Sequence, residues 1–148
     1  MKSLYPFAFV IFSSFISGAQ IPAGYYDGAT GTGTILKTQL HNIINGHTIV
    51  SYTPGVWNAY ETTDRDYYYE NDGTILDMYS ENPNGIDSYN FYLSTNQCGN
   101  YSNEGDCYNR EHSFPKSWFD DASPMVTDLF HVYPTDGKVN SYRGNYPF

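Results

Sequence analysis

The chain has 148 residues and carries 16 acidic against seven basic side chains, a formal net charge of −9. That length suits one domain with a single hydrophobic core and argues against several domains. The overall negative charge argues against a protein that holds polyanions through a generally basic surface. Tyrosine is abundant, with 16 copies, and aliphatic residues are sparse, so we expect an aromatic-rich core.

The first 19 residues have the pattern of a secretory signal peptide. Lys2 supplies a short positive start, residues 4–16 form an uncharged apolar run, and residues 17–19 (Ser-Gly-Ala) are small, as a signal peptidase requires. The run is short for a membrane span. We therefore predict a leader at 1–19, a mature domain at 20–148 and a secreted or periplasmic location, with an uncleaved anchor as the alternative.

Two helices are predicted in the first half of the mature chain. After a loop at 24–33, Thr34 can cap a helix whose apolar residues recur on one side as far as residue 44, and Asn45-Gly46 ends it. A second helix starts at Thr53-Pro54, where proline suits the first turn. Trp57 and Tyr60 lie about one turn apart in it and form an apolar face.

The middle of the chain predicts one short strand and a long loop. Residues 74–79 (TILDMY) are apolar and lie between two turn sequences, which indicates a strand. Residues 87–106 are rich in Asn, Ser, Tyr and Gly, and we expect them to form a long ordered loop.

Two cysteines occur in the chain, Cys98 and Cys107. In an oxidising compartment such a pair favours a disulfide. The alternative is a zinc site completed by His112 and His131, but the spacing fits none of the usual short ligand pairs.

Charge changes along the chain. Residues 20–109 contain eleven acidic and two basic residues, whereas residues 110–148 contain five acidic and four basic ones together with two histidines. Cations are therefore concentrated in the last quarter of the chain. This local concentration favours a nucleic-acid ligand there, although the net charge of the whole chain is negative.

Two sequence blocks in that quarter predict a strand, a second strand and a helix. The first block is residues 109–117 (NREHSFPKS), and the second is residues 127–145 (TDLFHVYPTDGKVNSYRGN). Residues 128–133 are strand-like, and Pro134 is expected to end that strand. Thr135 or Asp136 can then cap a helix that runs to residue 143 and closes at a glycine.

The residue types in these blocks suit phosphodiester hydrolysis. His112 can take a proton from water near neutral pH. Glu111 and Asn140 offer oxygen ligands for Mg²⁺, which keeps several waters and takes further ligands from phosphate. Arg143 shares a helix face with Asn140 and is the first candidate to grip phosphate oxygens, with Arg110 second.

The same blocks resemble the bacterial endonuclease I family, secreted or periplasmic nucleases of the His-Me finger (ββα-metal) fold. The resemblance rests on Glu111-His112, on residues 128–131 (DLFH), on residues 134–140 (PTDGKVN) and on residues 143–145 (RGN). It implies an α+β fold with a ββα-metal core at about 107–145, N-terminal helices and long ordered loops. The family's sequences continue beyond the point where this chain stops, so we expect the domain to be incomplete at its C-terminus.

The resemblance implies that His112 is the general base and that Glu111 and Asn140 hold the metal. We expect Arg110, Lys116 and Lys138 to contact the substrate, with Arg143 acting at the catalytic centre and His131 and Asp128 supporting it. We expect a secreted, Mg²⁺-dependent endonuclease that cuts DNA with low sequence specificity. RNA is the alternative substrate, and other divalent cations are alternatives to Mg²⁺. The alternatives are a non-catalytic secreted carbohydrate- or surface-binding module and an inactive, truncated family member.

Overall fold

The computed structural model describes residues 21–147, so the expected leader at 1–19 lies outside the described residues. The chain divides into two compact units, with the boundary between His47 and Thr48. The described part of the first unit contains one helix, α1 (Gly33–Ile44). The helix itself was predicted, but Thr34 lies inside it, and the N-cap is Thr32, whose side chain makes no capping hydrogen bond. None of the helices in residues 21–147 is long and apolar enough to cross a membrane.

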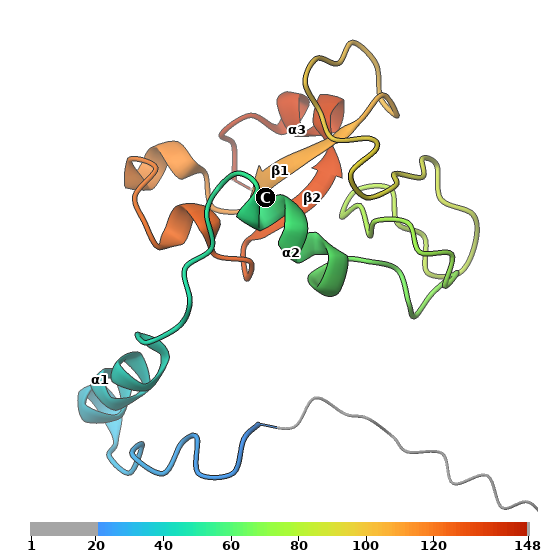
Figure 1. The fold of residues 1–148 in the computed structure, drawn as a ribbon. Helices are drawn as coiled ribbons and strands as arrows, with labels where there is room; N and C mark the ends of the chain where they lie inside the picture. The colour runs from blue at the N-terminus through green and yellow to red at the C-terminus, as the bar shows by residue number, and fades with distance from the viewer. Residues whose placement is uncertain (1–20, 148) are drawn as a thin grey trace, which may run out of the picture. The chain divides into compact units, whose positions relative to one another are not determined.

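The second unit contains α2 (Gly55–Thr63), β1 (Tyr108–His112), two short 3₁₀ helices at Lys116–Phe119 and Met125–Thr127, β2 (Val132–Asp136) and α3 (Gly137–Arg143) (Figure 1). β1 and β2 form a two-stranded antiparallel sheet, and α3 follows β2 directly. The arrangement is an α+β fold, which confirms the predicted class at that level.

An aromatic-rich core holds α2 against the sheet, as the composition predicted. Trp57 and Tyr60 of α2 are buried, and the Trp57 ring meets the ring of Tyr108 on β1 edge to face, with centroids 5.3 Å apart. The Tyr60 hydroxyl donates to the carbonyl of Val132 on β2 at 3.4 Å. Aromatic pairs of this kind add to the free energy of burial, so α2 fixes the position of both strands.

The predicted strand at 74–79 is wrong. Ile75 is buried, but it forms only an isolated bridge with Arg65. The backbone N–H of Ile75 donates to Phe91, and that of Leu76 donates to Asp64, so consecutive residues bond to different segments. Asp77 then accepts hydrogen bonds from the backbone N–H of Tyr79 and the Ser80 hydroxyl, which turns the chain after one residue of extended pairing.

The predicted boundary of the second strand is also wrong, because β2 begins at Val132 and continues through Pro134 to Asp136. Hydrogen-bonded pairs flank the sheet at Ser113–His131 and Cys107–Gly137. Antiparallel pairs alternate, so the intervening Arg110–Pro134 pair falls at a non-hydrogen-bonded position. Proline needs no N–H there, and the strand tolerates it.

Helix α3 matches the prediction closely. The Asp136 carboxylate accepts hydrogen bonds from the backbone N–H groups of Lys138 at 2.7 Å and Val139 at 3.0 Å, so Asp136 is the N-cap. Gly144 closes the helix with φ of +58°, a conformation that favours glycine.

The long loop at 87–106 contains no helix or named strand, as expected. Cys98 and Cys107 form the predicted disulfide, with Cα atoms 5.0 Å apart. Since Cys107 directly precedes β1, the bond ties this loop to the start of the sheet.

Candidate active site

One cavity brings the predicted catalytic residues together. It has a volume of about 210 Å³ and lies where β1 meets α3. Its lining comprises Arg110, Glu111, His112, Pro115, Lys116, Asn140, Arg143, Gly144 and Asn145. Residues from the two sequence blocks therefore share one space, because the antiparallel pairing of β1 with β2 places α3 beside β1.

Glu111 is a buried carboxylate with one paired oxygen. Its side chain is 1% exposed, and Oε1 accepts a hydrogen bond from Arg143 Nη1 at 2.9 Å. Within residues 21–147, Oε2 is buried and receives no hydrogen bond. Burial raises the pKa of Glu111 to about 7, and the positive charge of Arg143 opposes that rise.

His112 is held so that one ring nitrogen is committed to the protein. Its Nε2 lies 3.0 Å from the carbonyl oxygen of Val126. A carbonyl only accepts, so the neutral ring carries its proton on Nε2 and has its lone pair on Nδ1. Burial lowers the pKa of His112, which favours this neutral form.

Aromatic rings surround the His112 imidazole. The Tyr52 ring is stacked at a centroid distance of 6.1 Å and an interplanar angle of 29°. The rings of Phe119 and His131 lie 6.4 Å and 5.8 Å away. Sequence reasoning did not identify Tyr52, Phe119 or Val126, because each comes from a segment with no catalytic motif.

Asn140 is oriented by β1. Its Nδ2 donates to Asn109 Oδ1 at 2.7 Å and approaches the carbonyl oxygen of Arg110 at 3.4 Å. These contacts use the amide nitrogen, so the amide oxygen is left for another partner. Together, the second oxygen of Glu111 and the amide oxygen of Asn140 are a donor set that fits a hard divalent cation.

Arg143 is committed largely to the protein. Besides Glu111, its guanidinium donates to the carbonyl oxygens of His112 at 3.1 Å and Ser113 at 2.8 Å. The side chain is 10% exposed. This geometry fastens α3 to the end of β1 and fixes the orientation of the Glu111 carboxylate.

The predicted substrate-contacting cations differ in position. Arg110 is packed between the rings of Tyr52 and Trp57, at 3.6 Å and 4.3 Å from their centroids. Lys116 lines the cavity and forms an exposed ion pair with Asp121 at 3.0 Å. Lys138 lies over the Tyr142 ring on α3 and does not line the cavity.

The two predicted supporting residues differ as well. His131 lies beside His112, and its Nε2 is 2.7 Å from the carbonyl oxygen of Met125. Asp128 instead accepts a hydrogen bond from the backbone N–H of Phe130 in a turn, and it does not line the cavity.

Comparisons with known proteins agree with this arrangement. The family model "Endonuclease I" matches residues 32–148. An extracellular ribonuclease of Bacillus subtilis (strain 168) is 41% identical over 131 residues, which cover 84% of this chain and 39% of that protein. An extracellular ribonuclease of Bacillus amyloliquefaciens is 40% identical over 127 residues, with the same 84% and 39% coverage.

The chain thus spans 39% of the length of these relatives. No solved structure is significantly similar to it. The family match covers most of the chain, including β1, β2 and α3. The chain therefore belongs to the Endonuclease I family.

Proposed function

We propose that this chain carries the catalytic centre of a secreted nuclease that hydrolyses phosphodiester bonds in nucleic acids. The observation that carries the proposal is the shared cavity, in which His112 and Glu111 of β1 meet Asn140 of α3. Family membership and the names of the two relatives support it. β1, β2 and α3 would form the ββα-metal unit of a His-Me finger. A non-catalytic carbohydrate- or surface-binding module would have no use for this convergence of residues.

His112 is the general base in this proposal. With its Nε2 proton directed at the Val126 carbonyl, the Nδ1 lone pair is available to accept a proton from water. That water attacks the phosphorus atom, and the bond from phosphorus to the 3′ oxygen breaks. A buried, neutral imidazole suits this role because it is ready to accept a proton at physiological pH.

Glu111 and Asn140 would hold a divalent metal ion, and Mg²⁺ is our choice because it is bound through a few oxygen ligands. A divalent ion held there supplies positive charge that offsets charge on the phosphate and the leaving oxygen. Arg143 donates a hydrogen bond to Glu111 Oε1, so Oε2 is the carboxylate oxygen that is left for the metal ion. Lys116 and the guanidinium of Arg143 would contribute positive charge at the cavity wall.

We propose DNA and RNA as substrates, cut with little sequence preference. Contacts to phosphate carry no base information, and the cavity is lined by groups that suit phosphate. Both relatives are named extracellular ribonucleases, which favours RNA as one substrate. The leader pattern at residues 1–19 supports secretion.

The test compares the parent chain with its His112→Ala variant on supercoiled plasmid and on single-stranded RNA in Mg²⁺. Loss of the general base should lower the rate by about 10²–10⁴-fold on both substrates. Addition of EDTA should stop cleavage by the parent.

His47→Ala is the matched control, because His47 is exposed and its ring nitrogen contacts only the nearby carbonyl of Ile44 among the described residues. It should cleave at the parent rate. Equal rates for His112→Ala and the parent would remove His112 from the mechanism. An inactive parent with intact folding would favour the alternative of an inactive family member.

A further inference from the structure

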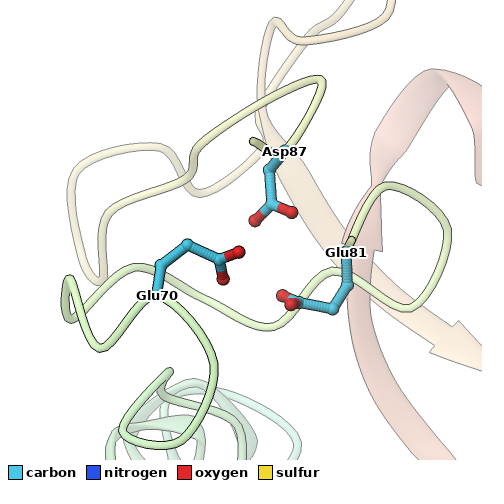
Figure 2. Close-up of side chains that lie close together, drawn as sticks. All are labelled: Glu70, Glu81 and Asp87. Carbon is cyan, nitrogen blue, oxygen red and sulfur yellow. The ribbon is translucent and has the colours of Figure 1, made fainter. Parts of the chain in front are cut away.

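Three carboxylates converge outside the cavity. Glu70 follows the tyrosine run at 67–69, and Glu81 and Asp87 lie on either side of the turn at 82–85. One oxygen from each lies within 4.8 Å of the others. Figure 2 shows the three carboxyl groups turned toward a common space. None of the three lines the cavity that contains Glu111.

The two carboxylate oxygens of Glu81 are shielded from solvent and have no hydrogen-bond donor among the described residues. Each of these oxygens exposes less than 1 Å² to solvent. Asp87, by contrast, accepts a hydrogen bond from the backbone N–H of Asn82 at 2.7 Å. A carboxylate removed from water without a donor is strongly unfavourable unless a cation or a proton compensates it.

Among residues 21–147, no basic side chain forms an ion pair with Glu81. Apart from burial, the groups that raise the pKa of Glu81 to about 7 are all acidic: Asp87, Glu70, Asp66 and Asp72. Arg65, the basic residue nearest in sequence, is paired with Glu61. Negative charge is therefore gathered around a partly exposed side chain whose two carboxylate oxygens are shielded from solvent, and a bound cation would stabilise such an arrangement.

We propose that Glu70, Glu81 and Asp87 bind a Ca²⁺ ion. Calcium binds oxygen ligands at about 2.3–2.6 Å, so two ligands on opposite sides of the ion lie up to about 5 Å apart. Three oxygens that all lie within 4.8 Å of one another are compatible with this range. Magnesium is usually bound through one or two carboxylates and keeps several waters, so a site with three carboxylates favours calcium. Three carboxylates supply up to six oxygens, and Glu70, which is exposed, opens the site to solvent.

The ion would stabilise the segment at 64–107, which lies between α2 and β1 and contains no regular secondary structure. Within this segment, Asp77 accepts a hydrogen bond from the backbone N–H of Asp136, the cap of α3, at 3.1 Å. Burial raises the pKa of Tyr79, and the negative charge of the nearby Glu111 raises it further. Calcium binding would thus stabilise the segment that supports the active-site helix.

The test is thermal unfolding of the whole chain after treatment with a chelator, with CaCl₂ or MgCl₂ then added. Calcium sites in extracellular modules have Kd values of about 0.1–1 mM. At about ten times Kd, the Tm should rise by about 4 °C with Ca²⁺, and by clearly less with Mg²⁺. Terbium luminescence excited through tyrosine gives a second readout, because Tyr67, Tyr68 and Tyr69 directly precede Glu70.

Glu81→Gln should abolish the rise in Tm with Ca²⁺. In chelator this variant should unfold at the parent temperature or higher, because a buried and repelled charge has been removed. Glu70→Gln should weaken the effect and serves as a second variant. Glu104→Gln is the matched control, because Glu104 is an exposed acid outside the cluster, and it should respond like the parent.

Two results would overturn the proposal. A parent that gains no stability from Ca²⁺ would show that a proton satisfies Glu81, and an undiminished rise in Glu81→Gln would place the calcium elsewhere. The proposal does not depend on nuclease activity. Glu111→Gln should keep the calcium response, so failure of the calcium site and failure of the proposed catalytic site can be told apart.

Discussion

Glu111 and Arg143 illustrate how single residues in the cavity combine two tasks. The ion pair joins β1 to α3 and also leaves one carboxylate oxygen without a hydrogen bond from the described chain. Burial alone would favour the protonated acid, and Arg143 opposes that tendency. The pair therefore contributes to the fold and leaves one oxygen open to the metal ion that we propose.

Arg110 belongs to the fold more than to the substrate. Its guanidinium stacks between Tyr52 and Trp57 and donates to the Tyr52 carbonyl and to the Thr53 hydroxyl. Lysine cannot reproduce this planar stacking or the paired donors. Arg110→Lys should lower the free energy of unfolding by about 1–2 kcal/mol, measured by urea denaturation, while KM for nucleic acid stays close to the parent value.

Arg65→Lys is the matched control for that substitution. Arg65 lies just beyond the end of α2 and pairs with Glu61, four residues earlier, and partly exposed pairs of this kind contribute about 1 kcal/mol or less. A raised KM with unchanged stability in Arg110→Lys would instead restore Arg110 as a substrate contact.

At the scale of elements, the start of α3 depends on close packing with the disulfide. A Cβ atom on Gly137 would lie 2.6 Å from Cys98 Sγ and 3.0 Å from the Tyr101 ring. Gly137→Ala should therefore lower the free energy of unfolding by about 1–3 kcal/mol, the usual cost of overpacking. Thermal unfolding measures this, and cleavage should weaken as well because Asn140 lies on the same helix.

Gly99→Ala provides the comparison, since a Cβ at Gly99 meets nothing within 4 Å although the residue adjoins the same disulfide. It should change stability by less than about 0.5 kcal/mol. Equal effects of the two substitutions would contradict the packing argument.

The elements that the sequence predicted are those with local signals. The helix at 137–143 carries its own cap and stop residues, and Asn45-Gly46 follows the helix at 33–44, whose expected cap, Thr34, lies inside it; the disulfide was expected from two cysteines behind a leader-like start. The strand at 74–79 failed because Ile75 and Leu76 pair with different distant segments. The sequence predicted that Pro134 ends the second strand, because only the pairing register shows that this position needs no backbone N–H.

The candidate site also combines residues with a local sequence signal and residues that only the fold brings close. Glu111, His112 and Asn140 carry a recognisable motif, and the structure brings them to one cavity. The groups that orient them are remote in sequence: the Val126 carbonyl lies 14 residues after His112, and Tyr52 precedes it by 60. The Glu70, Glu81 and Asp87 cluster was missed for the same reason, because three turns without regular structure bring it together.

For the whole molecule, the distribution of charge limits how nucleic acid can be held. The chain has a net charge of −9. In the described part of the second unit, Arg65 is paired with Glu61, Arg110 is stacked between aromatic rings and Arg143 is 10% exposed. Lys116, which lines the cavity although it pairs with Asp121, and Lys138 on α3 are the remaining cations of this unit, and general attraction for a polyanion should be weak.

This distribution predicts a shallow dependence of binding on salt. Each neutralised phosphate contributes about −0.9 to the slope of log K against log salt, so two lysines give a slope of about −2. The measurement is fluorescence anisotropy of a short labelled duplex with His112→Ala, which should bind without cutting, at several salt concentrations in constant Mg²⁺. Lys116→Met should reduce the slope by about one unit, whereas Lys37→Met, on α1, should leave it unchanged. A slope of about −5 would show that cations beyond these two hold the substrate, and these two lysines would then be an incomplete set of phosphate contacts.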